Sequence, residues 1–277
     1  MGIAFPGKSM NAAPAAGVSR ESILLREDAG GIATLTLNRP DQYNALSAAL
    51  LAALQSALQD IADDKSIRVV VIAGAGKAFC AGHDLKEIHE HAERDFAKEA
   101  FERCQQVMLD LTRLPQPVIA RVHGPAYAAG CQLVAQCDLA VAAAEARFAT
   151  SGVNYGVFCS TPGVPLSRNI PRKLAMEMLL TGDPIDAATA AARGLVNRVV
   201  PASQLDAEVQ RLAQSILAQS PAVVAAGKKV FYEQAEKAMD QAYRDATAAM
   251  VDNVRSEDGR EGIAAFAEKR KPKWKGK

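Results

Sequence analysis

Residues 67–87 read IRVVVIAGAGKAFCAGHDLKE and residues 117–133 read PVIARVHGPAYAAGCQL. Each stretch begins with a near-continuous apolar run, which is typical of a strand buried on both faces of a sheet. Each run then passes through a turn of small residues and enters a helical pattern. Because strands that alternate with helices form stacked βαβ units, these two stretches predict an α/β fold.

The sequence before these stretches extends the pattern. Short β-rich runs at 23–26 and 32–37 are separated by the turn residues 28–31, which predicts a hairpin. Ser47 then stands where it can cap a helix that runs to about residue 63. A long helix is expected over 94–113, and a further strand over 138–143.

The character of the chain changes after about residue 171. Three segments with helical spacing follow, at 203–219, 221–234 and 238–253; Ser203 is expected to cap the first and Pro221 to begin the second. We therefore expect three regions: a disordered leader (1–20), an α/β core (21–200) and a helical C-terminal region (201–277).

Composition excludes several classes of protein. The chain of 277 residues is 49% apolar and 23% charged with a net charge of +1, which disfavours disorder and a nucleic-acid partner. No apolar stretch reaches the ~18 residues of a membrane helix. Five widely spaced cysteines and four histidines without a ligand pattern predict reduced thiols and no metal site. We expect a cytoplasmic protein; a weak organelle presequence in the leader is the alternative.

Three familiar nucleotide or hydrolase motifs are absent. Gly74 and Gly76 follow a buried strand, but the third glycine of GxGxxG is replaced by Phe79, so a dinucleotide site is rejected. Neither GxxxxGK[ST] nor GxSxG occurs, which excludes a phosphate-binding P-loop and a hydrolase nucleophile elbow.

The two small-residue turns offer a different chemistry. A strand-to-helix turn presents free backbone N–H groups with the partial positive charge of a helix N-terminus. Two such donors that converge on one carbonyl oxygen form an oxyanion hole. The alternative is that both segments are merely tight turns, which a glycine-rich turn taken alone usually is.

Eight segments stand in order along the chain: LNRP (37–40), NAL (44–46), KAFCAGHD (77–84), AGCQL (129–133), CD (137–138), TGDPI (181–185), ARGLV (192–196) and FAEKRKP (266–272). Through these segments the chain resembles the enoyl-CoA hydratase/isomerase (crotonase) superfamily over about residues 22–274. Within it, the segments AGHDLKE and FCSTPGV resemble the enoyl-CoA hydratase domain-containing group. The resemblance implies a spiral of stacked ββα units whose helical C-terminal region forms homotrimers, or hexamers of paired trimers.

The same resemblance implies a site for acyl-CoA, with no cofactor other than the coenzyme A of the substrate. The backbone N–H groups of His83 and Ala129 would form the oxyanion hole. Phe266 and Lys269 would approach the adenine and phosphates, commonly across a subunit boundary. The remaining implied contacts with coenzyme A or the acyl group are Arg39, Gln42, Tyr43, Ala45, Ala81, Asp84, Leu85, Lys86, Tyr127, Gly130 and Cys159.

The sequence departs from the family at the acid–base positions. Hydratases of this family use two glutamates, and Gln132 and Gly152 stand in their places. His83 matches a histidine of some decarboxylating members, although its backbone N–H alone is the simpler role. Three functions stay open: a weak hydratase or isomerase, a decarboxylase-like lyase acting on a malonyl-type thioester, and a non-catalytic acyl-CoA-binding protein.

Overall fold

The computed structural model describes residues 22–91 and 94–277. The leader expected at 1–20 lies outside the described residues. No helix of the described part is long and apolar enough to cross a membrane.

Six strands form the main sheet, in the order β1-β2-β3-β4-β6-β9. β1 and β2 form the expected antiparallel hairpin, and every other neighbouring pair is parallel. A small second sheet has the order β5-β7-β8. The strands are β1 (Leu24–Ala29), β2 (Ile32–Leu37), β3 (Val69–Gly74), β4 (Val118–Val122), β5 (Ala126–Tyr127), β6 (Leu139–Ala143), β7 (Arg147–Ala149), β8 (Ile185–Asp186) and β9 (Arg198–Val200).

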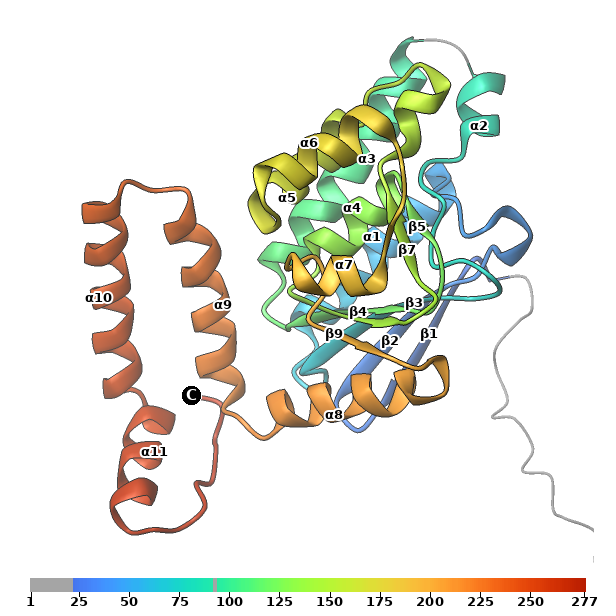
Figure 1. Ribbon diagram of the computed structural model, residues 1–277. Coiled ribbons are helices and arrows are strands. Elements are labelled where there is room, and N and C mark those ends of the chain that lie inside the picture. The colour runs from blue at the N-terminus through green and yellow to red at the C-terminus, as the bar shows by residue number, and fades with distance from the viewer. Residues whose placement is uncertain (1–21, 92–93) are drawn as a thin grey trace, which may run out of the picture.

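Helices cover both faces of the main sheet (Figure 1). One face packs against α1 (Ala48–Asp63), α3 (Arg94–Arg113) and α4 (Ala129–Gln136), which contribute to the large core. The other face packs against α8 (Leu205–Leu217) through Val209 and Ala213. The remaining helices of the body are η1 (Pro40–Gln42), α2 (Leu85–Glu90), η2 (Ser151–Tyr155), α5 (Ser160–Asn169), α6 (Arg172–Thr181), α7 (Ala187–Ala192) and η3 (Ala202–Gln204).

Two of the expected helix starts have different outcomes. Ser47 caps α1 as predicted, because its hydroxyl accepts the N–H of Leu50. The prediction that Ser203 caps α8 is wrong: Ser203 lies inside η3, and Gln204 precedes α8 in a helical conformation without a side-chain cap.

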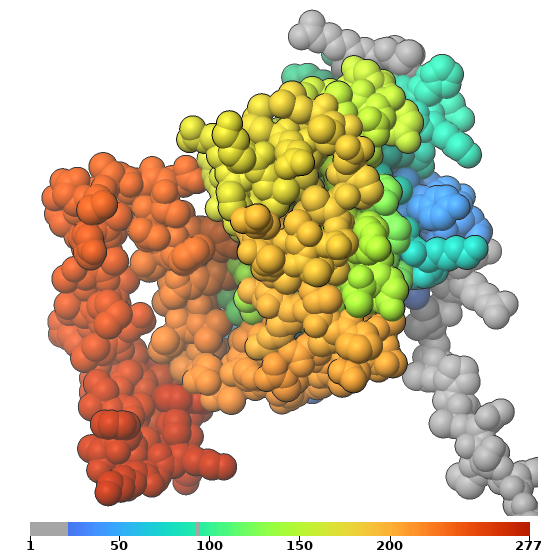
Figure 2. Space-filling view, viewed as in Figure 1, coloured from blue at the N-terminus to red at the C-terminus, as the bar shows by residue number. Residues whose placement is uncertain are grey.

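The last three helices form an arm that stands beside the body: α9 (Pro221–Ala235), α10 (Met239–Arg255) and α11 (Glu257–Ala267). Figure 2 shows this arm, coloured orange to red, as a lobe of its own. Neither α9 nor α10 has a fully buried residue. The expected helical C-terminal region is therefore present, and its first helix, α8, packs on the sheet.

Candidate functional site

The two small-residue turns lie side by side. Tyr127 donates its N–H to the carbonyl of Cys80 at 2.9 Å, and Phe79 donates to the carbonyl of Pro125 at 3.0 Å. A Cβ added to Gly130 would lie 2.1 Å from the Cys80 oxygen, so only glycine permits this approach. The small residues noted in the sequence thus bring the two turns into contact.

The N–H groups of His83 and Ala129 sit at the centre of this contact. Neither donates a hydrogen bond to another described residue, whereas the neighbouring Asp84 N–H binds the carbonyl of Leu46 at 3.1 Å. Ala129 is the first residue of α4, where an N–H has no partner within its own helix. A Cβ added to Gly82 would lie 3.2 Å from the Ala129 nitrogen, so the two donors belong to adjacent backbones.

Backbone strain marks the second turn. Ala128 has φ 47° and ψ −117°, in a region that L-residues rarely adopt. Its N–H is held by the carbonyl of Ala149 at 2.8 Å. Because strained residues persist only where their surroundings fix them, this conformation indicates a turn built to aim the Ala129 N–H.

Hydrogen bonds of the Asn44 side chain hold a third loop, residues 39–46, against the first of these turns. The Asn44 side chain is fully buried and donates to the carbonyls of Ala75 and Ala78 at 2.8 Å each. Its Oδ1 accepts the N–H of Arg39 at 2.9 Å. Sequence reasoning placed Asn44 in a motif but gave it no role, since its partners lie more than thirty residues away.

Arg39 and Asp84, both predicted to contact coenzyme A, bind each other. Their side chains form an ion pair at 2.8 Å, and the Arg39 guanidinium also donates to the carbonyl of Ala45. The Asp84 carboxylate accepts the N–H groups of Lys86 and Glu87 and so caps α2. Burial alone raises the pKa of Asp84, but these hydrogen bonds outweigh it and lower the pKa. The Arg39 guanidinium is therefore already paired within the protein, whereas the ammonium group of Lys86 is exposed and more accessible to a ligand.

The other predicted contact residues divide by exposure. Tyr43 directly follows η1 and is 57% exposed, and Leu85 is the first residue of α2 and is 55% exposed. A ligand can therefore reach both side chains. Gln42 and Ala81 are also exposed, and Tyr127 is half-buried. Ala45 and Gly130 are buried, so only their backbone can face a ligand.

The His83 side chain is enclosed and uncharged. Its ring packs edge-on against Phe101 with centroids 4.8 Å apart, and its Nε2 is buried without a hydrogen-bond partner among the described residues. Desolvation lowers the pKa of His83 to about 4. The imidazole is therefore neutral at physiological pH. Sequence reasoning did not find Phe101, whose helical position carries no motif.

This burial predicts a pH dependence of stability. Since the pKa of His83 is about 4 in the folded state and about 6.5 when unfolded, the unfolded chain binds more protons between these values. The neutral, buried His83 therefore contributes its full share of the unfolding free energy above pH 6.5. This contribution falls by about 2–3 kcal/mol as the pH drops toward 4. Urea unfolding of the wild type and a His83→Leu variant at pH 4.5, 5.5 and 7 measures this. Parallel curves for the two proteins would contradict it.

The acid–base positions hold no titratable side chain, and one of them has no room for it. Gln132 is only 4% exposed, and its Oε1 is buried without a partner among the described residues. A Cβ added to Gly152 would lie 2.4 Å from the Val157 carbonyl oxygen and 2.7 Å from the Cys159 sulfur. The Gly152 N–H donates to that sulfur at 3.2 Å. Burial raises the pKa of Cys159, which disfavours a thiolate.

Phe266 and Lys269 are not brought to the other predicted site residues within this chain. Both lie at the end of the arm, with Phe266 87% exposed and Lys269 just after α11. The basic tail beyond them folds back: Asp258 accepts the N–H groups of Lys275 and Gly276, and Trp274 donates to the carbonyl of Ala218.

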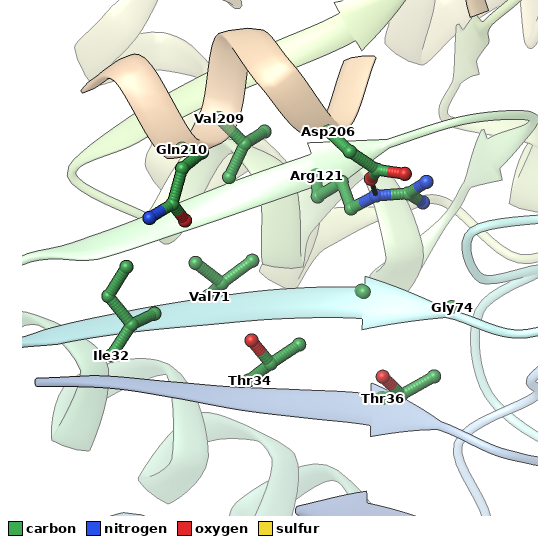
Figure 3. A pocket seen from close by; sticks show the side chains of 10 residues that line it. Ile32, Thr34, Thr36, Val71, Gly74, Arg121, Asp206, Val209 and Gln210 are labelled. Carbon is green, nitrogen blue, oxygen red and sulfur yellow. Dashed lines mark hydrogen bonds and ion pairs between the residues drawn. The ribbon is translucent and has the colours of Figure 1, made fainter. Parts of the chain in front are cut away.

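A separate pocket of about 280 Å³ lies between the main sheet and α8 (Figure 3). Thr34 and Thr36 face it from β2, and the ion pair of Arg121 and Asp206 closes one side. None of the predicted site residues lines it. The Asp206 side chain is largely exposed, so this ion pair contributes little to stability.

Comparisons with known proteins agree with the fold. A crystal structure of an enoyl-CoA hydratase from Mycobacterium smegmatis matches with a TM-score of 0.90 and 54% identity, covering 92% of this chain and 99% of that one. Human enoyl-CoA hydratase domain-containing protein 3 matches as a structure with a TM-score of 0.89 and 47% identity, covering 91% of this chain and 100% of that one. The expected crotonase-type α/β fold with a helical C-terminal region is confirmed.

The expectation of a cytoplasmic protein is wrong. Relatives from five vertebrates, 45–49% identical, are named enoyl-CoA hydratase domain-containing protein 3, mitochondrial. The expectation rested on reduced cysteines and on the lack of a secretory signal. Neither observation distinguishes the cytoplasm from an organelle that keeps thiols reduced.

Sequence relatives and the family model point the same way. The human relative is 49% identical over 244 residues, which cover 88% of this chain and 80% of the relative. The family model described as enoyl-CoA hydratase/isomerase matches residues 27–277. The resemblance to this superfamily, and to its domain-containing group, is confirmed. The chain belongs to the enoyl-CoA hydratase/isomerase family.

Proposed function

We propose that this protein binds acyl-CoA thioesters and polarises the thioester carbonyl between the N–H groups of His83 and Ala129. The observation that carries the proposal is that these two donors lie on adjacent backbones and have no acceptor among the described residues. Donors fixed in advance stabilise the negative charge that develops on a thioester oxygen during enolate formation.

Hydration of an enoyl thioester is expected to be slow in this site. The reaction needs one group to activate water and one to deliver a proton, which together are worth about 10²–10⁴-fold. Gln132 cannot titrate near neutral pH, and the space beside Gly152 is filled by Val157 and Cys159. The neutral His83 and the protonated Cys159 do not restore a carboxylate pair.

Crotonyl-CoA turnover, followed by loss of enoyl absorbance, tests this proposal. We expect the wild type to turn over at ~1 s⁻¹ or less, about a hundredfold below an ordinary ~10² s⁻¹, because acid–base catalysis is missing. Gln132→Glu should raise the rate at least about tenfold. The exposed Gln210→Glu is the matched control and should change nothing.

The outcomes separate the candidate functions. Wild-type turnover near ~10² s⁻¹ would contradict the carboxylate argument. CO2 release from malonyl-CoA without crotonyl-CoA turnover would identify the decarboxylase-like lyase, which needs the oxyanion donors but no base. Thioester binding with neither reaction would identify a non-catalytic acyl-CoA-binding protein. Gly152→Glu is not a usable variant, since its side chain would clash with the Val157 backbone.

We also propose that the arm mediates self-association into a homotrimer, with hexamers as paired trimers. A groove of about 490 Å³ on α10 is lined mainly by apolar side chains, including Tyr243, Met250 and Val254. Exposed apolar surface of this kind is typical of an interface. Phe266 in α11 and Lys269 just after it would then reach the coenzyme of a neighbouring subunit, which accounts for the separation of α11 from α4 within one chain (Figure 1).

Light scattering tests this assembly. We expect a mass near three or six times 29.3 kDa for the wild type. Met250→Glu should shift the mass toward one chain, because it puts a charge on the apolar face of α10. Met176→Glu, at an exposed position of α6 in the body, is the control. A wild-type monomer would remove the basis for assigning coenzyme contacts to Phe266 and Lys269.

A further inference from the structure

The pocket between the main sheet and α8 exists because the helix covers only part of that face of the sheet. α8 packs mainly on β3, β4 and β6. The strip left between α8 and β2 is the pocket of about 280 Å³ in Figure 3. None of the residues assigned to the thioester site lines it. It is therefore a second cavity, which the proposed function does not use.

The strand register sets two polar side chains on either side of a small one. Thr36 of β2 pairs with Ala73 of β3. Val71 of β3 pairs with Ile119 of β4, so Arg121, two residues further along β4, faces the same side of the sheet. Two strand spacings, about 10 Å, separate the Cα atoms of Thr36 and Arg121. The methyl group of Ala73 does not fill the space between them, which leaves room for a ligand.

The Arg121 guanidinium has one free edge. Its Nε donates to the Asp206 carboxylate, and its two Nη groups make no hydrogen bond to a residue in the ranges 22–91 and 94–277. A free Nη edge has the geometry that binds both oxygens of a carboxylate. The Thr36 hydroxyl faces the pocket and can donate to the same group. Asp206 already offsets part of the Arg121 charge, so a second negative charge on the ligand would have no cation to pair with.

The opposite end of the pocket is apolar. Ile32, Val71 and Val209 line it and are all buried. Figure 3 shows Ile32 at the end away from Arg121 and Thr36. Four residues of β2 separate Ile32 from Thr36, which corresponds to about 13 Å along the strand. The pocket thus has a cationic end and an apolar end at a distance that a short hydrocarbon chain can span.

We propose that this pocket binds a monocarboxylate with a short, uncharged hydrocarbon chain, such as a free fatty acid of about six carbons. The carboxylate takes the Nη edge of Arg121 and the Thr36 hydroxyl. The chain lies over Ala73 and reaches Val71 and Val209, where burial of its methylene groups adds to the affinity. A second carboxylate at the far end is disfavoured, because the apolar side chains there cannot compensate its desolvation.

Titration of the full chain with hexanoate, followed by NMR or calorimetry, tests this site. We expect saturable binding with a Kd of about 1 mM, an ordinary value for so small a ligand. Acetate lacks the chain, hexanamide lacks the charge and adipate carries a second carboxylate. Each should bind at least about tenfold more weakly than hexanoate.

Two variants separate ligand binding from a structural role of the ion pair. Arg121→Gln should weaken hexanoate at least about tenfold. Asp206→Asn should bind hexanoate at least as tightly as the wild type, because it keeps the guanidinium and removes a competing carboxylate. If Arg121 served only to hold α8 on the sheet, both variants would weaken binding alike. Since Asp206 is 79% exposed, both should keep the wild-type melting temperature within about 2 °C.

A matched control and a competition experiment complete the test. Arg168→Gln breaks another exposed ion pair, with Glu236, and should leave hexanoate binding unchanged. Butyryl-CoA should not displace hexanoate. Absence of saturable binding up to about 20 mM, unchanged affinity in Arg121→Gln, or displacement by butyryl-CoA would each overturn this inference. None of these results bears on thioester binding, whereas failure of butyryl-CoA itself to bind would overturn the proposed function alone.

Discussion

Gly130→Ala is expected to destabilise the protein by about 4 kcal/mol and to abolish thioester binding. The new methyl group would lie 2.1 Å from the Cys80 carbonyl oxygen and 2.9 Å from its Cβ. Overpacking usually costs about 1–3 kcal/mol, but here the obstacle is backbone that also accepts the Tyr127 N–H, so the two turns must separate. Separation moves the His83 and Ala129 donors apart, which removes the oxyanion hole.

Urea unfolding and calorimetry with butyryl-CoA measure both effects. Gly227→Ala is the matched control, because a Cβ at Gly227 meets nothing within 4 Å on α9. That variant should gain about 0.5–1 kcal/mol of stability from the better helix former. A Gly130→Ala protein that unfolds like the wild type and binds butyryl-CoA would show that the contact between the turns is not required.

Local signals account for the parts of the fold that the sequence predicted well. The glycine turn between β1 and β2, the cap at Ser47 and the limits of α3 depend on residues close together in the chain. No helix or strand was predicted from the sequence between β7 and β9. α5 contains Pro162 and Pro165, which ordinarily argue against a helix. α8 begins from η3 instead of from a Ser203 cap, because tertiary packing of Leu205 and Val209 fixes its start.

The candidate site was predictable where it depends on backbone and not where it depends on distant side chains. The two small-residue turns indicated backbone N–H donors, and the resemblance to the family assigned these donors to His83 and Ala129. Asn44 and Phe101 were missed, because their roles come from contacts across the fold. The predicted coenzyme contact of Arg39 was assigned without seeing that Asp84 occupies its guanidinium.

The arm depends on a buried ionic cluster for its attachment to the body. Lys228 of α9 is largely buried, and its Nζ contacts Asp138 at 2.7 Å and the carbonyls of Leu111 and Gln116 at 2.8 and 3.0 Å. Tyr232 donates its hydroxyl to the other Asp138 oxygen at 2.8 Å. Burial lowers the pKa of Lys228, and the Asp138 carboxylate opposes that shift. Since α9 buries no residue completely, these polar contacts replace an apolar anchor.

Lys228→Met is therefore expected to cost about 3–5 kcal/mol of unfolding free energy, because it leaves the Asp138 carboxylate buried without its cation and frees two carbonyls. Tyr232→Phe, which removes one hydrogen bond, should cost only about 1–2 kcal/mol. In a double-mutant cycle, adding Asp138→Asn to Lys228→Met should cost less than the sum of the two single changes, since the second change removes the uncompensated charge. Additive losses would show that the two residues act independently.

Hydrogen exchange gives a second measurement. Amides of α9 should lose protection in Lys228→Met while those of β3 keep it, because the arm detaches before the sheet opens.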